Sequence, residues 1–558
     1  MNVEEVQRRL WEQSKAHQQH RVSDAPLFPV NAYDGRIRNL MDLMHNPMWL
    51  NAAAERVLQR SKGKASGVDS VKTHEFERNM AQNLESLRLE LKRSMYKPQP
   101  LRRVMIPKAN GKMRPLGIPC LRDKIVQEAI RMALEPIFEV EFHDSSYGFR
   151  PNRSTHHAVA RCQQLMHRSF TWVIEGDVKS CFDEISHPAI LKCVREKVMD
   201  NKFIDLIQLF LKAGVVIDGK LHPTVKGVPQ GGVVSPLLAN VVLNKLDWFL
   251  HSKGAYDNAM RRVYYQGGQN IRFVRYADDW CVLLTRSNKR RALKLREEIR
   301  DFLKEECELE LSEEKTHITH VHDGFDFLGF HLEVSIGKHG KPIPKIKVTD
   351  KAVQNARQLV IEKLRNKPMQ VGIDTRIYET NAAIRGWSNY YKIAHDHYAH
   401  ANRLDHHTFW VAIKMICRKY DITTAKCFRK FYRGGTIDVQ GKCKLIRFTD
   451  TEMSLDYRGP EPYEPSKAVY VTDDELEANF QMPAYSRPDS GLLKSQAIIR
   501  DGNRCVKCGK SVTLKTSHAD HIKPVKCFAN FKQAHTIENV QTLCLDCHKG
   551  KSSEERKV

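Results

Sequence analysis

The chain has 558 residues, of which 41% are hydrophobic, and this is enough for several domains with sizeable cores. Its formal net charge of +24 and pI of about 9.4 favour a polyanionic partner such as nucleic acid, with a general solubility charge as the alternative. No apolar run approaches the roughly 18–20 residues of a membrane span. The N-terminus, MNVEEVQRRLWEQ, has early acids and no apolar core, so we expect neither a membrane protein nor a secretory signal.

The pattern of strands and helices in the larger part of the chain predicts an α+β fold. FTWVIEGDVKSCFDEI (170–185) begins as a strand and ends in an acidic turn, and VRYADDWCVLL (274–284) has the composition of a buried hairpin. Residues 288–306 carry apolar side chains at helical spacing, and residues 324–334 and 341–348 predict a further pair of strands.

The end of the chain predicts a separate small module. Five prolines between residues 456 and 491 predict an extended linker, and fewer than 70 residues follow from Leu492. A module of that size usually needs a cross-link, such as a disulfide or a bound metal ion, to be stable. Of the fourteen cysteines ten are isolated, whereas the other four form two C-x-x-C pairs in this module, which favours a reducing compartment and one metal site over a disulfide framework.

Three aspartates stand where strands are predicted to end. Asp177 follows the apolar strand WVIEG, and Asp278 and Asp279 interrupt the predicted hairpin. If both strands belong to one sheet, the three carboxylates gather at one edge and raise one another's pKa values. Two Mg²⁺ ions would compensate them and would activate an attacking 3′-hydroxyl and a leaving pyrophosphate. A solvated turn is the alternative for an isolated pair of aspartates.

The surrounding motifs resemble those of reverse transcriptases. YADD (276–279) is similar to their catalytic hairpin, GDVKSCFDEI (176–185) to their first palm motif, and GVPQGGVVSPLLANVVLNKLD (227–247) to the next. LSEEKTHITH (311–320), FLGFHL (327–332), IPKANGKMRPLGIP (106–119) and YGFRPNRSTHHA (147–158) resemble further motifs. The resemblance implies that Asp177, Asp278 and Asp279 bind the catalytic ions, that Phe182 excludes a nucleotide 2′-hydroxyl, and that Lys108, Arg114, Gln230 and Lys315 contact the incoming nucleotide. For Lys108 and Arg114, a solvated basic turn is the alternative.

Two further stretches resemble group II intron-encoded proteins in particular. KASGVDSVKTHEF (64–76) is similar to their extra N-terminal motif, and IRGWSNYYKIA (384–394) to their thumb, or maturase, segment. The aromatic residues and arginine of the second stretch, Arg385, Trp387, Tyr390 and Tyr391, are candidate RNA contacts by base stacking, whereas packing within the thumb is the alternative and is favoured for Trp387. The basic segment Lys426–Phe448, with interleaved aromatic residues, fits an accessory DNA-binding region.

The C-terminal module resembles an HNH endonuclease, a ββα-metal nuclease. Cys505, Cys508, Cys544 and Cys547 suit a tetrahedral structural Zn²⁺ site. Between and after the pairs, HADHIKP (518–524), NVQTLC (539–544) and His548 carry the resemblance. It implies that His521 is the general base, that Asp520 and His548 hold one Mg²⁺ or similar ion, and that Asn539 orients His521, while His518 is peripheral. A zinc ribbon that only binds DNA is the alternative.

Together these resemblances imply a right-hand polymerase, with an antiparallel palm sheet and an α-helical thumb, fused to a small zinc-stapled ββα-metal module. We expect an N-terminal extension with fingers and palm (1–345), a thumb (346–425), a basic DNA-binding region (426–455), a Pro-rich linker (456–491) and the nuclease module (492–558).

The implied function is that of a group II intron-encoded protein that acts as RNA-directed DNA polymerase, assists splicing, and nicks the target strand to prime reverse transcription. Its implied partners are the intron RNA, double-stranded target DNA and dNTPs. A homodimer is left open. The expected location is the cytoplasm of a bacterium, and an organellar host stays open. A domesticated or defence-associated reverse transcriptase, a splicing factor with an inactive polymerase, and an RNA-templated RNA polymerase are the alternatives.

Overall fold

The computed structural model describes residues 2–22, 36–61, 65–107, 113–255, 270–337, 340–439, 443–454 and 459–467 and, near the C-terminus, residues 497–498, 500–502, 504–512, 516–522, 539–545 and 547. The chain divides into two compact units, Met1–Glu477 and Ala478–Val558. Among the described residues there is no helix with both the length and the apolar character to cross a membrane.

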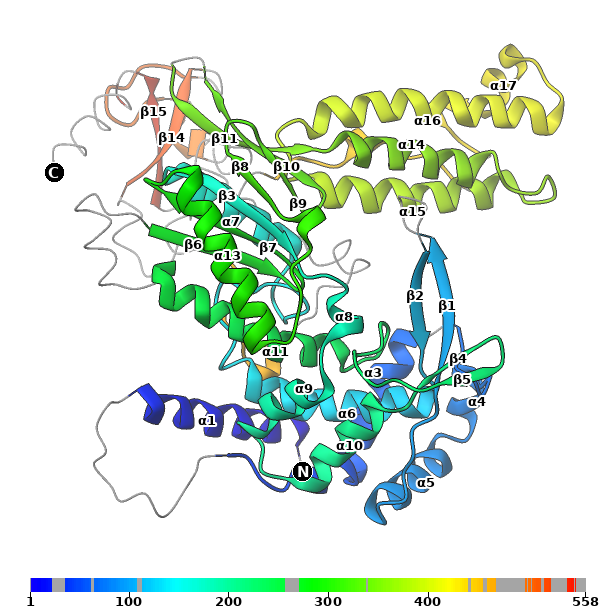
Figure 1. The fold of residues 1–558 in the computed structure, drawn as a ribbon. Helices are drawn as coiled ribbons and strands as arrows, with labels where there is room; N and C mark the ends of the chain where they lie inside the picture. The colour runs from blue at the N-terminus through cyan, green and yellow to red at the C-terminus, as the bar shows by residue number, and fades with distance from the viewer. Residues whose placement is uncertain are drawn as a thin grey trace. The chain divides into compact units, whose positions relative to one another are not determined.

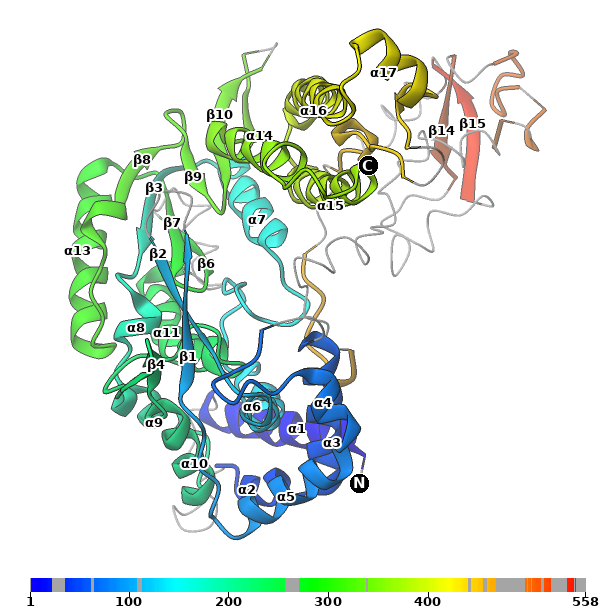
Figure 2. The same ribbon diagram turned by 90° about the vertical axis from the view of Figure 1, so that its right-hand side faces the viewer.

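Helix α6 (Leu121–Phe138) is the central helix of the N-terminal part of the first unit (Figures 1 and 2). Its side chains are buried along nearly the whole length because other helices pack around it, and the indole of Trp49 donates a hydrogen bond to its Ala129 carbonyl. Helices α1 (Val3–Val22), α2 (Leu40–Met44) and α3 (Pro47–Ser61) contact α6, and α4 (Thr73–Arg78) and α5 (Met80–Lys92) pack against α3.

A small mixed sheet in the order β2-β1-β4-β5 stands beside these helices. Strands β1 (Leu101–Pro107) and β2 (Met113–Ile118) form an antiparallel pair, and β1 runs parallel to β4 (Val215–Ile217), which pairs with β5 (Lys220–His222). Residues 147–158 of the predicted fingers motif lead into helix α7 (Thr155–His167), whose N-terminus is capped by Ser154.

The second sheet is fully antiparallel, in the order β6-β7-β3-β8, and it carries the aspartates. Its strands are β3 (Phe170–Asp177), β6 (Asn270–Tyr276), β7 (Asp279–Thr285) and β8 (His317–His320). The predicted strand at 170–177 and the hairpin over 274–284 are therefore confirmed. Trp280, Val282 and Leu284 enter one hydrophobic core, and Cys281 and Leu283 enter another, so this sheet is covered on both faces.

Helices cover the two faces of this sheet. The first core contains residues of α11 (Ser235–Leu250) and α13 (Lys289–Glu306), and α13 confirms the predicted amphipathic helix. The second core contains residues of α7 and of the thumb. The remaining short elements of the palm are α8 (Cys181–Glu184), α9 (His187–Arg195), α10 (Asn201–Leu211), the π-helix η1 (His251–Ala255) and the 3₁₀ turn η2 (Glu313–Lys315).

The segment 324–334 is not the single strand that the sequence predicts. It forms two strands, β9 (Phe325–Phe327) and β10 (Phe330–Ile336), because the chain reverses at Leu328 and Gly329, both of which have positive φ. The apolar pattern is continuous through this tight turn, and it therefore hides the break. Strand β11 (Pro342–Val348) pairs with β10 and confirms the last predicted strand.

The thumb consists of helices lying side by side, as the sequence predicts (Figure 1). Its helices are α14 (Asp350–Leu364), α15 (Ile373–Tyr391) and α16 (His397–Tyr420). The helix α17 (Thr424–Phe431), the short strands β12 (Tyr432–Arg433) and β13 (Thr436–Ile437), and the turn η3 (Phe448–Asp450) follow and belong largely to the predicted basic region. Arg376 is fully buried at the start of α15, where it donates hydrogen bonds to the carbonyls that join α14 to α15.

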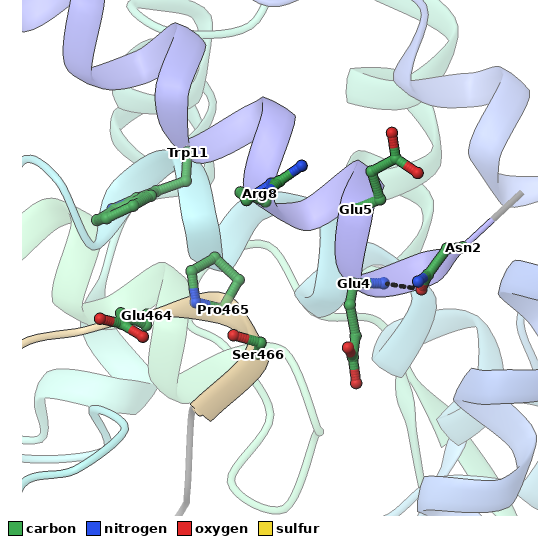
Figure 3. Close-up of a pocket in the computed structure, with 8 residues that line it drawn as sticks. All are labelled: Asn2, Glu4, Glu5, Arg8, Trp11, Glu464, Pro465 and Ser466. Atoms are coloured by element: carbon green, nitrogen blue, oxygen red, sulfur yellow. Dashed lines mark hydrogen bonds between the residues drawn. The ribbon is translucent and has the colours of Figure 1, made fainter.

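Part of the predicted linker is packed rather than extended. Tyr463 lies edge-on to Trp11 of α1 with the ring centroids 6.4 Å apart, and its hydroxyl is 3.5 Å from a Glu135 carboxylate oxygen on α6. The turn η4 (Pro465–Lys467) follows, and Glu464, Pro465 and Ser466 line a pocket against α1 (Figure 3). Residues 459–467 thus belong to the first unit, and residues 468–491 of the predicted linker lie outside the described residues.

The second unit contains one described antiparallel pair of strands. Strand β14 (Ser517–His521) pairs with β15 (Val540–Cys544), with Ser517 opposite Cys544 and His521 opposite Val540. Its described hydrophobic core is small and consists of Cys505, Val512, Leu543 and Cys544. Two of these four residues, Cys505 and Cys544, belong to the predicted metal site.

Arg376→Met should lower the free energy of unfolding by roughly 3 kcal/mol, because the carbonyls that its guanidinium satisfies would stay buried without donors. The midpoint of urea unfolding checks this. Arg385→Met on the exposed face of the same helix is the control and should leave the midpoint nearly unchanged. Equal midpoints for the two variants would contradict the capping role of Arg376.

Candidate functional site

The structure brings the three predicted aspartates together at one edge of the palm sheet. Strand β3 ends at Asp177, strand β7 begins at Asp279, and the two residues are directly paired in the antiparallel ladder. Asp278 occupies the two-residue turn between β6 and β7. The register of β3 against β7 therefore makes one carboxylate cluster out of residues that are a hundred positions apart in the chain.

The electrostatics of this cluster favour a bound cation. Desolvation and then the charges of Asp278 and Asp177 raise the pKa of Asp279 to about 7, although its side chain still reaches solvent. Desolvation and the charge of Asp177 also raise the pKa of Asp278. Oxygen donors that repel one another in this way fit a divalent cation such as Mg²⁺, which would remove the repulsion.

Lys315 is the side chain that balances part of this charge. Its ammonium group donates a hydrogen bond to Oδ2 of Asp177 at 2.5 Å, and this bond raises the pKa of Lys315. Two-thirds of the lysine side chain is exposed, so the ammonium group can reach other anions in the same place. The predicted nucleotide contact thus lies directly at the carboxylate cluster.

The turn that carries Asp278 is held from behind by a buried guanidinium. Arg275 pairs with Asp247 of α11 at 2.6 Å and donates to the Asn240 side chain at 2.8 Å and to the Ala277 carbonyl at 3.0 Å. Both members of the ion pair are almost completely buried. Ala277 has a φ of 57°, which is unfavourable for alanine, so the turn depends on this support.

Sequence reasoning missed this network, although a signal for it exists. Arg275 shares a strand face with Phe273 and Ile271, and Asp247 lies within the apolar helix SPLLANVVLNKLDWFL. Charged residues at such positions are almost never fully buried unless they are paired. The chain contains both partners in motifs that were already recognised, but only the fold brings them together.

The predicted gate and two of the predicted nucleotide contacts lie in the described part of the first unit. Phe182, on α8, is partly buried, and the Gln230 amide donates to the neighbouring Asp183 carboxylate at 3.2 Å. Arg114, on β2, is exposed, and its charge acts to lower the pKa of Asp278, which places it within electrostatic reach of the cluster. Lys108 lies outside the described residues. Gln230 also lines a groove of about 410 Å³, together with Arg103, Asp183, His222 and Lys226.

The candidate RNA contacts on α15 differ in their accessibility. The Tyr390 ring stacks on Phe330 at 5.3 Å and its hydroxyl donates to the Leu328 carbonyl at 2.8 Å. The Trp387 indole donates to the Ala352 carbonyl at 3.3 Å, and its ring lies 4.9 Å from that of Tyr391. These rings join the second core, as the packing alternative predicts for Trp387, whereas Arg385 is exposed.

In the second unit the four cysteines converge. The Sγ atoms of Cys505, Cys508, Cys544 and Cys547 all lie within 4.8 Å of one another. Four thiols from two separate parts of the chain at this spacing fit a tetrahedral Zn²⁺ ion. The spacing in the sequence predicts this convergence, and the structure adds that it joins the start of the module to the end of β15.

The candidate nuclease residues are only partly described. Asp520 lies on β14 opposite Gln541, and the backbone of His521 is opposite Val540. Asn539 is buried just before β15, and its carbonyl accepts a hydrogen bond from Ile522 at 2.7 Å. His518 lies on the same strand, and His548 is outside the described residues. The β14–β15 pair therefore brings Asp520, His521 and Asn539 into one hairpin.

Comparison with known families matches three parts of the chain. Residues 106–332 match the reverse transcriptase (RNA-dependent DNA polymerase) family, residues 353–432 match the group II intron maturase-specific domain, and residues 505–554 match the HNH endonuclease family. Protein YkfC of Escherichia coli is 42% identical over 55% of this chain and 86% of that protein. The group II intron-encoded protein LtrA of Lactococcus lactis is 29% identical over 82% of this chain and 87% of that protein.

The chain belongs to the group II intron-encoded protein family. It combines a reverse transcriptase domain, a maturase domain and an HNH endonuclease domain, so it is a multifunctional enzyme of this family. The palm aspartates lie within the reverse transcriptase match, Trp387 and its neighbours within the maturase match, and the four cysteines within the HNH match. The maturase domain implies RNA binding and the HNH domain implies DNA binding in this family.

Gly176→Ala should disturb the group II protein at its catalytic edge. A Cβ at residue 176 would lie 2.1 Å from the buried Trp280 ring, so β3 must shift beside Asp177. We expect the free energy of unfolding to fall by about 1–3 kcal/mol. Primer extension, measured on the same preparation, should fall by more than the loss of folded protein explains. Gly386→Ala in the thumb, where a Cβ meets nothing within 4 Å, is the matched control. Normal extension by Gly176→Ala would contradict this constraint on β3.

Proposed function

We propose that this protein copies RNA into DNA at the carboxylate cluster of the palm and thereby carries out retrohoming of its own intron. The observation that carries the proposal is the pairing of Asp177 with Asp279 beside Asp278 at the edge of the palm sheet. Two Mg²⁺ ions held by these carboxylates would activate the primer 3′-hydroxyl and stabilise the leaving pyrophosphate.

The protein's own residues position the nucleotide. Lys108, Arg114 and Lys315 bind the triphosphate, because Lys and Arg suit phosphate oxygens. Gln230 lines the nucleotide and template site next to Asp183, and the ring of Phe182 fills the space that a 2′-hydroxyl would need. The substrates are therefore dNTPs, and an RNA-templated RNA polymerase is not favoured.

The C-terminal module nicks the strand that becomes the primer. Its four cysteines hold a structural Zn²⁺ ion within a ββα-metal fold. His521 takes the proton from the attacking water, since its ordinary pKa lies near working pH. Asp520 and His548 hold one divalent ion at the scissile phosphate, and Asn539 fixes the loop that presents His521.

The RNA and DNA partners are the intron RNA and a double-stranded target. Arg385, which is exposed, is the member of the thumb set best placed for RNA, and Trp387, Tyr390 and Tyr391, which are partly buried against the second core, complete the proposed set on the same helix. The region 426–455 contributes exposed Lys426, Arg429, Lys430 and Arg433 to DNA binding. In this proposal the thumb spans residues 346–425, after the fingers and palm, and the nuclease module spans residues 492–558. The protein acts in the bacterial cytoplasm. It could act there as a homodimer.

This function is tested by expressing the protein from its native locus, with the flanking transcript, purifying it, and sequencing the RNA that copurifies. One dominant structured RNA that carries this reading frame, together with spliced exons in the cell, is expected. In a matched preparation of the variant, Asp278→Asn should lower cDNA synthesis by about 10³-fold or more, because it removes a metal-binding charge. Splicing should survive in this variant.

Asp323→Asn, in an exposed turn between β8 and β9, is the control and should keep both activities. A heterogeneous RNA population with normal polymerase chemistry would instead indicate a domesticated or defence-associated reverse transcriptase. A parent protein that never makes cDNA would overturn the polymerase proposal.

The metal content of the nuclease module gives a separate test. The protein should carry about one zinc ion per chain, measured by mass spectrometry, and Cys508→Ser should lose that ion and the nicking activity while primer extension stays nearly intact. Cys417→Ser in the thumb is the matched control. Zinc retained by Cys508→Ser, or primer extension lost together with nicking, would contradict an independent zinc-stapled module.

A further inference from the structure

Phe149 is an exposed aromatic residue in an unfavourable backbone conformation. Its φ is 57° and 49% of its surface is exposed, whereas its neighbours Tyr147 and Arg150 are almost completely buried. A bulky residue in the left-handed region costs free energy and gains little from packing when half of it faces solvent. This combination at one position suggests a function for the side chain rather than a role in folding.

The loop around Phe149 is fixed by its neighbours. The Arg150 guanidinium pairs with Glu139 at 2.8 Å and donates to the carbonyls of His143 and Ser146. On the other side, the Asn240 amide donates to the Gly148 carbonyl at 2.8 Å.

Gly148 itself touches the catalytic turn, because a Cβ there would lie 2.4 Å from the Ala277 nitrogen. The backbone amide of Tyr147 also donates to the Arg275 carbonyl at 2.8 Å. The loop and the turn that carries Asp278 are thus held as one unit, and the position of the Phe149 ring is set by groups that also hold the catalytic turn.

The ring of Phe149 lies beside the gate. Its centroid is 6.2 Å from that of Phe182 at an interplanar angle of 87°, the edge-to-face arrangement that aromatic pairs prefer, and 6.4 Å from that of Tyr276. Phe182 and Tyr276 come from two different palm motifs that flank the aspartates. Phe149 therefore connects the gate with the catalytic hairpin through its exposed ring.

From this geometry we infer that Phe149 is a positioning residue for sugar selection, which holds the Phe182 ring against the space of a nucleotide 2′-hydroxyl. The inference rests on the proposed role of Phe182 as the gate. Phe182 is on a four-residue helix and is only partly buried, so it needs a second contact to keep one orientation. Phe149 supplies that contact from a fixed loop and, through it, couples sugar selection to the catalytic turn.

Single-nucleotide incorporation on an RNA template by the full-length protein tests the inference. The efficiency of dNTP over rNTP incorporation is measured for Phe149→Gly, since glycine adopts a φ of 57° freely and keeps the loop in place. We expect the preference for dNTP to fall by about tenfold, the size of one edge-to-face aromatic pair, mainly through more efficient rNTP use. The rate with dNTP should change little.

Four companion variants, three single and one double, separate the explanations. Phe149→Tyr keeps the ring and should keep the preference, and Tyr378→Ala, which removes an exposed aromatic ring from α15, should leave it unchanged. Phe182→Ala should lower the preference by about 100-fold. Adding Phe149→Gly to Phe182→Ala should lower it no further, because Phe149 acts through the Phe182 ring.

The outcomes are distinct. If Phe182→Ala loses the preference but Phe149→Gly retains it, the inference is overturned and the gate stands. An equal loss of dNTP and rNTP incorporation in Phe149→Gly would also overturn it, since that pattern belongs to a merely structural residue. If Phe182→Ala still rejects rNTPs, the gate assignment itself fails and the inference fails with it.

Discussion

The buried ion pair between Arg275 and Asp247 is the interaction on which the catalytic edge depends. It joins strand β6 to helix α11, and the same guanidinium reaches Asn240, Ser146 and the carbonyl of Ala277. A buried pair of this kind is costly to break, because the remaining charge has no water and no partner. The carboxylates can repel one another at the surface of the sheet because their backbone is fixed from beneath.

The palm sheet can serve as this platform because both of its faces are covered. Alternate residues of β7 enter two different hydrophobic cores, one shared with α11 and α13 and the other with α7 and the thumb. The catalytic turn, which carries Asp278, lies next to the end of β3. Rigid strands therefore present the aspartates, and Arg114 and Lys315, two of the proposed nucleotide contacts, lie on β2 and in η2 after α13.

The C-terminal module is organised by a different constraint. Its described core cluster holds four buried residues, and two of them, Cys505 and Cys544, are also candidate metal ligands. The four thiols bring the beginning of the module to the end of β15, which is where cross-linking by a metal ion is most effective. The polymerase unit depends on the buried ion pair, and this module depends on its four thiols. Each part should therefore stay folded when the interaction that stabilises the other part is removed.

The sequence alone determined the chemistry of this protein and the order of its parts. The two C-x-x-C pairs, YADD, and the apolar strand ending in Asp177 are local patterns. Such patterns can be recognised from a few neighbouring residues, without knowledge of the tertiary structure. Strands at 170–177 and 274–284 and the helix at 288–306 were predictable for the same reason, because alternation and helical spacing reflect burial of one or both faces.

Only the tertiary structure decided what depends on contacts between distant segments. The pairing of Arg275 with Asp247, the contact of Phe149 with Phe182, and the stacking of Tyr390 on Phe330 join residues that are far apart in the sequence and that no local pattern relates. The turn at Leu328 was missed because continuous apolar residues hide a tight turn. The packing of Tyr463 on α1 was missed because prolines also occur in packed segments. Sequence fixes which side chains are able to do the chemistry, and packing fixes which of them meet.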